Sequence, residues 1–335
     1  MQTLSVGVVG AGDIAHKVHL PVLLSMPHVH VQWIHDANVA RGRSVAAAHG
    51  LKAVDARSPQ DLPACDIALL AIPVGARAAY HQAFAKRGTG VLAEKPFAAS
   101  VNDHRALTDM YPPHSLGCGY MRRFYSSTQI LRQLVRSAPF GPLRRIVISE
   151  GNRTTASRVD RSYIDDPRLS SSGGILSELG CHSLDVALYV TGARGYEVRS
   201  CALDLDGDID RKVTAHFRLT DSGHLPEAGI DVDYCVSWLD RQENRIVLEF
   251  EHSFVWTEIS PNSDVRMGKI AEASTAMTLI PAARGAVTAN QAFYLQWQAF
   301  IDGFRAKTES EVSARSALLS TSVVEALYDR GRPRD

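Results

Sequence analysis

The chain has 335 residues, of which 45% are hydrophobic and 21% charged, a balance typical of a soluble globular protein. This length exceeds one ordinary hydrophobic core and therefore predicts two domains. The formal net charge of zero excludes a strong electrostatic attraction to nucleic acid or to an anionic membrane surface.

The chain opens with an apolar run, Leu4–Val9, that leads directly into Gly10-Ala11-Gly12-Asp13-Ile14-Ala15. A strand followed by Gly-x-Gly-x-x-Ala and a helix is the pattern that holds a dinucleotide pyrophosphate. Gly10 permits the tight turn, Gly12 lets backbone N–H groups approach the phosphates, and Ala15 lets the helix pack on the strand. The start of the helix favours the negative charge.

The choice of cofactor depends on the end of the next apolar stretch, 29–34. It leads to Asp36, 24 residues after Gly12, where a carboxylate can accept hydrogen bonds from the adenosine ribose. Such a carboxylate repels a 2′-phosphate and favours NAD. Arg41 and Arg43 follow closely and could reach a phosphate, but we interpret them as solvated residues at the start of a helix. We expect NAD, with NADP as the other option.

The first third of the chain alternates strands with helices. Besides the two strands above, we expect strands at 67–72, 90–93 and 116–120. We expect helices after the glycine loop (with a break or restart at Pro21), around 43–49, over 76–87, and from a Ser100 cap to Met110. Such alternation predicts parallel strands joined by crossover helices, which is a doubly wound sheet.

Beyond about residue 120 the rhythm changes. A helix over 126–137 precedes a strand at 143–150, and another helix begins near Ile175. Strands without intervening helices are predicted at 197–205, 212–219, 229–239, 245–251 and 254–259, and two helices, 290–306 and 313–329, follow. We therefore predict an α/β chain. Residues 1–121 form an N-terminal doubly wound Rossmann domain, and residues 122–335 form a C-terminal α+β domain with a large, mostly antiparallel open sheet.

The tripeptide Glu94-Lys95-Pro96 follows the predicted strand at 90–93. Ligands of open α/β sheets bind beyond the carboxyl ends of the strands, so Lys95 emerges where a nicotinamide would lie. Its ammonium group can donate to a substrate hydroxyl and stabilise the developing alkoxide. Pro96 is a candidate for a cis bond. The alternative is a solvated Glu–Lys pair at a strand end.

The helix at about 175–190 carries the second candidate group. Its spacing places Glu178, His182, Asp185 and Tyr189 on one polar face between apolar sides, which predicts that this face lines a cleft. His182 suits proton transfer from an alcohol, and Glu178 can hold its imidazole. The alternative is a solvated face with a structural His–carboxylate pair. Hydride transfer from an alcohol needs only a base and an oxyanion partner, so no metal is expected.

Together these residues resemble the Gfo/Idh/MocA superfamily (glucose–fructose oxidoreductase, inositol dehydrogenase, rhizopine catabolism). The resemblance covers nearly the whole chain. Its landmarks are the Gly10–Ala15 loop, His19-Leu20-Pro21, Asp36, Pro73, His81, Glu94-Lys95-Pro96, Gly119-Tyr120, Arg123-Phe124, Gly141, Ser172-Gly173-Gly174-Ile175-Leu176, Gly180, His182, Asp185 and Phe300-Ile301. It implies an NAD(P) domain followed by an α/β domain whose open sheet often forms dimers or tetramers. It also implies a catalytic Lys95 and a proton-transferring His182. The chain departs from the family at Glu178, where Asp is common.

The predicted site residues fall into three sets. The catalytic set is Lys95, His182 and Glu178. The cofactor-binding set is Gly10, Gly12, Asp13, Ile14, Ala15, Asp36, Ile72, Pro73, His81, Glu94 and Lys95. The substrate-binding set is Lys95, Arg123, Arg153, Arg168, Asp185 and His182, because guanidinium groups suit a phosphate or carboxylate. Two alternatives for the arginines are pairing with the nearby Asp160, Asp165 and Asp166, or an arm that reaches into another subunit.

The expected function is NAD(P)-dependent hydride transfer to or from a secondary alcohol or ketone of a sugar, cyclitol or related polyol, with or without an anionic group. A non-catalytic dinucleotide-binding regulator and an NAD-assisted lyase or glycosidase are the alternatives. The expected partners are a small-molecule substrate and further copies of the chain, as a homodimer or homotetramer through the C-terminal sheet, but neither nucleic acid nor membrane. Five scattered cysteines and no visible secretory signal predict a cytoplasmic protein with reduced thiols.

Overall fold

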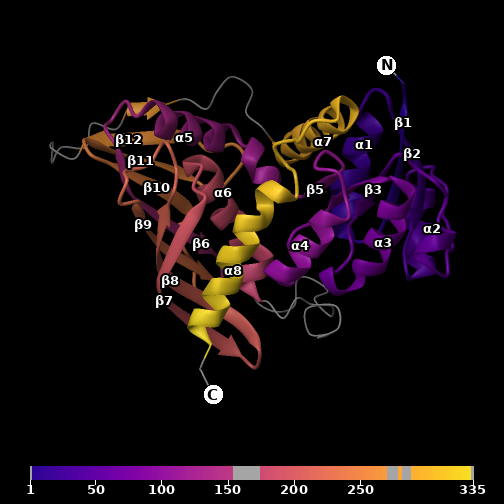
Figure 1. The fold of residues 1–335 in the computed structure, drawn as a ribbon, viewed down its shortest axis with the longest axis horizontal. Coiled ribbons are helices and arrows are strands. Elements are labelled where there is room, and N and C mark those ends of the chain that lie inside the picture. The colour runs from indigo at the N-terminus through magenta and orange to yellow at the C-terminus, as the bar shows by residue number, and fades with distance from the viewer. Residues whose placement is uncertain (1, 154–173, 270–277, 281–287, 333–335) are drawn as a thin grey trace. The chain divides into compact units, whose positions relative to one another are not determined.

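The computed structural model of the protein describes residues 2–153, 174–269, 278–280 and 288–332. These residues form two compact units, each of which is drawn in Figure 1. The first unit contains the chain up to Met121 together with Asn290–Leu318. The second contains the described residues from Arg122 to Ala289 together with those from Leu319 onward.

The first unit is built on a five-stranded parallel sheet in the order β2-β1-β3-β4-β5. Its strands are β1 (Leu4–Val9), β2 (Val29–His35), β3 (Ile67–Leu70), β4 (Gly90–Ala93) and β5 (Leu116–Cys118). Every residue of β3 and β4 is buried, as expected for strands covered on both faces. The predicted doubly wound sheet is confirmed.

The register of this sheet brings successive loops to one edge. Val9 pairs with Leu70, Leu70 with Ala93, and Ala93 with Cys118. The residues that follow each of these strands therefore leave the sheet at the same carboxyl edge. The strand order reverses at β1, the position where open α/β sheets bind ligands.

The helices of the first unit begin and end at the expected kinds of residue. They are α1 (Leu20–Ser25), α2 (Val39–Ala48), α3 (Ala78–Arg87), α4 (Val101–Asp109) and α7 (Ala289–Ala306). The Ser100 side chain accepts from the Asp103 N–H, and α3 ends at a left-handed Gly88, both as predicted. A π-helical segment, Ala15–His19, precedes α1, and Pro21 lies in the first turn after it. The wider π-turn accommodates a proline that lacks an N–H.

Helix α7 packs in the first unit, although we expected this part of the chain in the second domain. A Cβ atom at Gly117 of β5 would lie 2.9 Å from Phe300, and one at Gly90 of β4 would lie 2.7 Å from Phe304. Both contacts show that α7 lies directly on the sheet. The late segment is also bonded to β5 through Cys118 N–H and Val312 O at 2.8 Å.

The second unit contains an eight-stranded sheet in the order β13-β12-β11-β10-β6-β9-β8-β7. Its strands are β6 (Leu143–Gly151), β7 (Gly195–Asp206), β8 (Ile209–Thr220), β9 (Ile230–Ser237), β10 (Arg245–Phe250), β11 (Ser253–Glu258), β12 (Val265–Lys269) and β13 (Thr278–Ile280). All neighbours are antiparallel except β6 and β9. The predicted mostly antiparallel sheet is confirmed.

Helices cover one face of this sheet, as Figure 1 shows for α5 (Ser126–Ser137), α6 (Cys181–Thr191) and α8 (Leu318–Gly331). Their apolar side chains, such as Leu131, Leu184 and Val323, form one core with the inward residues of β6, β8, β9 and β10. In these four strands, buried residues alternate with more exposed ones, which identifies the opposite face as the open one.

The structure differs from the sequence prediction in several elements. Strands β12 and β13 were not predicted; β12 contains Gly268 and two basic residues, which obscure its alternation. Helix α2 begins at Val39 rather than near Arg43, because the Asn38 side chain caps it by accepting from the Arg41 N–H. The parallel β6–β9 pair is compatible with the predicted, mostly antiparallel sheet; α6, β7 and β8 lie between the two strands in the chain.

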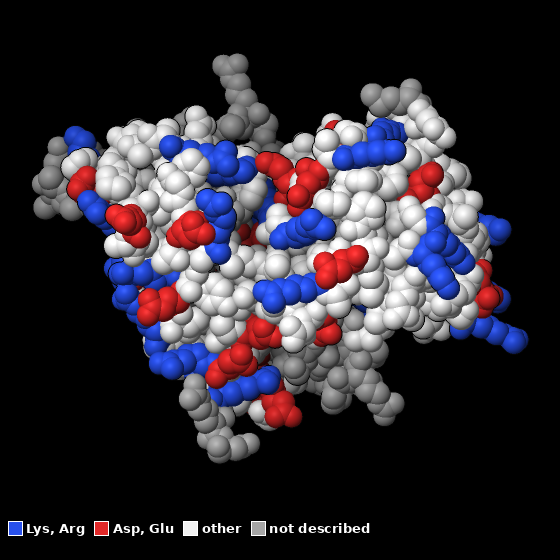
Figure 2. All heavy atoms as spheres, viewed as in Figure 1, with Lys and Arg blue, Asp and Glu red and all other residues white. Residues whose placement is uncertain are grey.

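Charges of both signs lie interspersed on the face of the protein seen in Figure 2, in agreement with the zero net charge. Among the described helices, none combines the length and the apolar character needed to cross a membrane.

The buried carboxylate of Asp210 in β8 allows a stability prediction. It accepts from the N–H groups of Gly174 at 2.6 Å and Leu176 at 2.8 Å, and from the Tyr328 hydroxyl at 2.9 Å. Asp210→Ala leaves these donors buried without a partner, so we expect the free energy of unfolding to fall by about 2 kcal/mol or more. Urea denaturation measures this change.

The control is Asp206→Ala, which removes only an exposed ion pair with Arg211. It should change the free energy of unfolding by less than about 0.5 kcal/mol. Equal effects of the two variants would contradict the capping role of Asp210.

Candidate active site

The glycine loop after β1 has the geometry that a dinucleotide pyrophosphate requires. Gly10 has a φ of +98°, and a Cβ atom there would lie 2.2 Å from the Ala71 carbonyl oxygen, so only glycine fits. A Cβ atom at Gly12 would meet no atom within 4 Å, so the backbone is open at that point. Ala15 is fully buried where the helix packs on the sheet. The loop therefore fits the cofactor that the sequence predicts.

Asp36 lies directly after β2, and its side chain faces the same loop. Its carboxylate accepts from the N–H groups of Ala11 and Asn38, each at 2.7 Å. Burial alone would raise the pKa of Asp36, but the hydrogen bonds from Arg41 and from these two N–H groups hold it below its usual value. Asp36 is therefore ionised at neutral pH.

Arg41 corrects one expectation from the sequence, because it is not simply solvated. Its Nε and Nη2 atoms donate to the two oxygens of Asp36 at 3.1 and 2.9 Å, and half of its side chain remains exposed. Arg43 is likewise paired, with Asp55. The negative charge that would repel a 2′-phosphate is thus partly neutralised by a side chain that solvent can reach.

The other predicted cofactor residues occupy different environments. Ile14, Ile72 and Pro73 are partly exposed and lie just beyond β1 or β3, whereas the exposed Asp13 forms an ion pair with Lys17 at 2.9 Å. His81 is fully buried in α3 and contacts the Tyr111 hydroxyl at 3.2 Å. Burial and the nearby Arg77 charge lower the pKa of His81 to about 3, so it stays neutral. This position supports packing beneath the site rather than direct contact with a cofactor.

Lys95 lies in the loop after β4, and the Lys95–Pro96 peptide bond is cis, as the sequence predicted. The fully buried guanidinium of Arg77 holds this loop. Its Nη1 donates to the carbonyl oxygens of Glu94 at 2.5 Å and Pro96 at 2.6 Å, while its Nε donates to Ile72 O at 2.9 Å. Burial lowers the pKa of Arg77 to about 10, so it remains charged. Arg77 therefore joins the loops that follow β3 and β4.

Glu94 is buried, which argues against a solvated Glu–Lys pair. Its Oε1 lies 2.9 Å from His19 Nε2, and its Oε2 accepts from the Lys95 N–H at 3.2 Å. The indole N–H of Trp297 in α7 donates to His19 Nδ1 at 2.9 Å. Both His19 and Trp297 are fully buried. The residue before Lys95 is thus connected to α7 through two buried rings.

In the second unit, a π-helical segment, Leu176–Gly180, leads into α6. A Cβ atom at Gly180 would lie 2.3 Å from the Tyr234 hydroxyl, so this part of the helix approaches β9 closely. His182 is 8% exposed and Glu178 is partly exposed. Such π-turns are frequent at functional sites. Because Lys95 and His182 belong to different units, their joint action stays a prediction.

Two predicted substrate-binding residues contact each other instead. Arg123 Nε donates to Asp185 Oδ2 at 2.7 Å and its Nη2 to Oδ1 at 2.5 Å, and the Ser320 hydroxyl donates to Oδ1 at 2.8 Å. Arg123 and Asp185 are 3% and 1% exposed. These surroundings support a role in holding α6 rather than in contacting substrate.

Of the two other arginines predicted to bind substrate, the structure describes one. Arg153 is exposed at the end of the described segment. Arg168 lies outside the described residues, as do Asp160, Asp165 and Asp166, the alternative partners considered for the arginines. Within the described ranges, no group of three or more His, Cys, Asp or Glu side chains could hold a metal ion.

Sequence reasoning missed three side chains that shape the site: His19, Arg77 and Trp297. His19 was noted as a landmark, but no role followed from it. The available signal was a histidine next to the apolar Leu20 and Leu23 in a short helix, where a buried polar ring needs a partner. Nothing in the sequence indicates that this partner comes from a segment 278 residues further along the chain.

Comparison with known proteins gives one family. Residues 4–120 match the oxidoreductase family with an NAD-binding Rossmann fold, designated GFO_IDH_MocA. The myo-inositol dehydrogenase Hyg17 of Streptomyces leeuwenhoekii is 30% identical over 231 residues, which cover 65% of this chain and 67% of that protein. The uncharacterized oxidoreductase YrbE of Bacillus subtilis is 25% identical over 218 residues, covering 62% and 61%.

The whole fold has a counterpart among solved structures. The aldose-aldose oxidoreductase from Caulobacter crescentus, solved with glycerol, aligns with a TM-score of 0.82 at 19% identity and covers 99% of this chain and 98% of that one. At this identity the likeness concerns the fold alone. In the sequence alignments, the chain spans less than two thirds of the length of the first curated relatives that it matches.

The Asp36–Arg41 pair yields a prediction about cofactor choice. Arg41→Ala removes the positive charge and leaves Asp36 to repel a 2′-phosphate, so the Kd for NADP should rise about tenfold. The Kd for NAD should change by less than about threefold, because the ribose hydroxyls still find their acceptor. Isothermal titration with each dinucleotide measures both constants.

Arg43→Ala is the matched control, since Arg43 pairs with Asp55 rather than Asp36. It should leave the ratio of the two constants unchanged. If Arg41→Ala weakened both dinucleotides equally, the Asp36–Arg41 pair would have no part in discrimination.

Proposed function

This chain belongs to the Gfo/Idh/MocA family of oxidoreductases, and on that premise we propose that it is an NAD(P)-dependent dehydrogenase or reductase. Its substrate would be a secondary alcohol or ketone of a sugar, a cyclitol or a related polyol. Its relatives bear names of oxidoreductases and dehydrogenases, which favours this function over a non-catalytic regulator or a lyase.

One observation carries the proposal: Lys95 leaves the sheet at the same edge as the glycine loop. The strand before the loop, β1, pairs with β3, and β3 pairs with β4, whose last residue precedes Glu94-Lys95-Pro96. The buried Arg77 and Glu94 fix the backbone on both sides of Lys95. A lysine held in this way beside a dinucleotide loop suits electrostatic stabilisation of a reacting oxygen.

The residues take the following roles in this proposal. A nicotinamide cofactor held by the glycine loop would supply the hydride chemistry. Lys95 donates a hydrogen bond to the oxygen of the reacting carbon and stabilises its negative charge. His182 takes the hydroxyl proton during oxidation and returns it during reduction, and Glu178 orients the imidazole. Gly10, Gly12 and Asp36 hold the dinucleotide.

The substrate class rests on the family and on the polarity of the candidate groups. The relative Hyg17 is named as a myo-inositol dehydrogenase, and a cyclitol fits donors such as Lys95 and His182. The exposed Arg153 could serve an anionic substituent.

Replacement of the proposed oxyanion donor tests the function. Lys95→Met keeps the length of the side chain but removes the ammonium group, so kcat should fall about 10²- to 10³-fold while the Kd for NAD is retained. The formation of NADH from NAD with myo-inositol, D-glucose or D-glucose 6-phosphate gives the rate.

Lys86→Met, at an exposed position on α3, controls for loss of a charge from the same unit. It should leave kcat unchanged. Near-normal turnover by the Lys95 variant would defeat the assignment.

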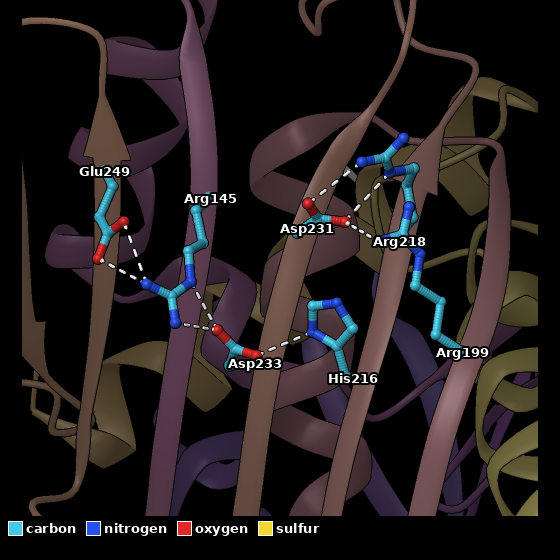
Figure 3. A network of polar contacts seen from close by, with 7 residues as sticks. All are labelled: Arg145, Arg199, His216, Arg218, Asp231, Asp233 and Glu249. Atoms are coloured by element: carbon cyan, nitrogen blue, oxygen red, sulfur yellow. Dashed lines mark hydrogen bonds and ion pairs between the residues drawn. The ribbon is translucent and has the colours of Figure 1, made fainter.

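We further propose that the chain forms a homodimer or homotetramer through the open face of the second sheet. Figure 3 shows this face: Arg218 on β8, Asp231 and Asp233 on β9, Arg145 on β6 and Glu249 on β10 alternate in sign across neighbouring strands. Such an alternating surface is complementary to a rotated copy of itself.

An apolar row lies beside these charges. Val147, Val247 and Trp256 are neighbours in the register of β6, β10 and β11, and Trp256 stacks on Phe254 at 5.4 Å. All four side chains are partly exposed. A mixture of aromatic, aliphatic and paired charged groups is typical of an interface between subunits.

Charge reversal at Asp233 tests this surface. Asp233 accepts from Arg145 at 2.6 Å and contacts His216 Nδ1 at 2.8 Å, so Asp233→Arg places like charges side by side. We expect the dissociation constant between subunits to rise at least about tenfold. Sedimentation velocity measures the change.

Arg136→Glu reverses an exposed charge on α5, on the helical side of the same unit, and should leave the assembly intact. An unchanged assembly in the folded Asp233 variant would exclude this face.

A further inference from the structure

The contact between Trp297 and His19 fixes the protonation of the imidazole. An indole N–H is a donor only, so His19 Nδ1, 2.9 Å away, must accept and carries no proton. The proton of the neutral ring is therefore on Nε2, which donates to Glu94 Oε1 at 2.9 Å. A doubly protonated ring would have no acceptor for the Trp297 N–H.

The surroundings of His19 allow no other partner for Nδ1 among the described residues. The ring is fully buried, and the rings of Phe293 and Trp297 lie edge-on to it with centroids at 5.0 and 5.9 Å. Both aromatic residues come from α7, and His19 ends the π-helical segment of the Rossmann unit. Trp297 of the late helix thus excludes a proton on Nδ1, while the ionised Glu94 requires one on Nε2.

The Glu94 carboxylate is held by two hydrogen bonds. One oxygen accepts from His19, and the other accepts from the Lys95 N–H at 3.2 Å. A Cβ atom at Gly119 would lie 2.9 Å from Glu94 Oε1, so the glycine leaves just enough room for the carboxylate. Gly119, which follows β5, thus confines the Glu94 carboxylate on one side, and hydrogen bonds from His19 and from the Lys95 N–H hold its two oxygens.

We propose that His19 and Trp297 are positioning residues for Lys95. Trp297 keeps a proton off Nδ1 of His19, and His19 donates from Nε2 to Glu94. Glu94 in turn holds the backbone of Lys95 and keeps a negative charge beside its ammonium group. This inference rests on the proposed function, because it assigns the relay to a lysine that acts on substrate.

The electrostatics of Glu94 support the relay. Burial alone would raise its pKa, but the His19 hydrogen bond and the charges of Lys95 and Arg77 hold it below the usual value. The carboxylate is therefore ionised when Lys95 must be an ammonium ion. Without the donor from His19, the buried carboxylate of Glu94 would lose one of the two hydrogen bonds described above.

Two substitutions at His19 separate the two halves of the relay. A Gln side chain places its amide near the position of Nε2 and can still donate to Glu94, whereas Asn reaches only the position of Nδ1, toward Trp297. For His19→Asn we expect kcat to fall about 10- to 100-fold, because Lys95 is displaced, with KM and the Kd for NAD within about threefold. His19→Gln should retain kcat within about threefold. The substrates are myo-inositol, D-glucose and D-glucose 6-phosphate, with NAD.

A merely structural histidine gives a different pattern. The two variants would then lower the temperature of unfolding, with equal effects on kcat or none, and the relay would be overturned. If the wild-type protein oxidised none of the three polyols, or if Lys95→Met kept its turnover, the proposed function would be contradicted. The catalytic role of His19 and Trp297 would then be contradicted as well. Normal turnover in wild type and in His19→Asn would overturn the relay alone.

A readout independent of activity uses the full chain labelled with ¹⁵N-histidine, with the His19 signals assigned from their loss in His19→Gln. Near neutral pH, His19 should show a neutral ring with the proton on Nε2. Trp297→Phe keeps a ring in place but removes the N–H donor, so a second proton on Nδ1 is no longer opposed and a doubly protonated ring should appear. A wild-type His19 that is charged or protonated on Nδ1 would overturn the proposal, and so would a Trp297→Phe ring whose protonation is the same as in wild type.

Discussion

The first unit depends on keeping one carboxylate ionised in its interior. A buried carboxylate without hydrogen-bond donors is costly, by several kcal/mol, and breaking its pairing is strongly destabilising. Glu94 meets this constraint through His19 and the Lys95 N–H, with the Arg77 charge close by. These groups come from the π-helical segment, the loop after β4 and the turn before α3. Satisfying Glu94 therefore orders the elements that surround Lys95.

The same constraint explains why α7 belongs to the Rossmann unit although it follows the second sheet in sequence. His19 needs an acceptor or donor at Nδ1, and Trp297 provides a donor from inside the unit. Phe300 and Phe304 anchor the helix on glycines of β5 and β4, so the position of Trp297 at the carboxyl edge is fixed by packing. A helix that covers the sheet thus also contributes to the polar interior.

Asp36 shows a different solution for a carboxylate at the same edge. Two backbone N–H groups donate to the Asp36 carboxylate. Its charged partner, Arg41, is half exposed, so breaking this ion pair costs little free energy. Glu94 instead bonds to the fully buried His19 and to the N–H of Lys95. The Asp36 carboxylate can therefore still accept from ribose hydroxyls, while the Glu94 carboxylate is committed to the protein itself.

Local patterns predicted the Rossmann strands, the glycine loop, the caps at Ser100 and Gly88 and the mostly antiparallel second sheet, because each follows from spacing along a few residues. The pairs that define the site could not be predicted in this way. Trp297 and His19 are remote in sequence, and Arg41 was interpreted as a solvated residue rather than as a partner of the cofactor-binding Asp36. The polar face of α6 was also misleading: a period of 100° per residue groups Asp185 with His182, but it cannot reveal that Arg123 neutralises Asp185 inside the core.

The Arg123–Asp185 pair shows how α6 is held in the core of the second unit. The helix is buried along nearly its whole length, so its polar residues need internal partners unless they serve a ligand. Asp185 takes Arg123 and Ser320, and Asp210 bonds the backbone where the π-segment begins. Gly180 lets that segment lie against Tyr234. Asp185 and Asp210 are thus committed to structure, whereas the catalytic roles of Glu178 and His182 stay predictions.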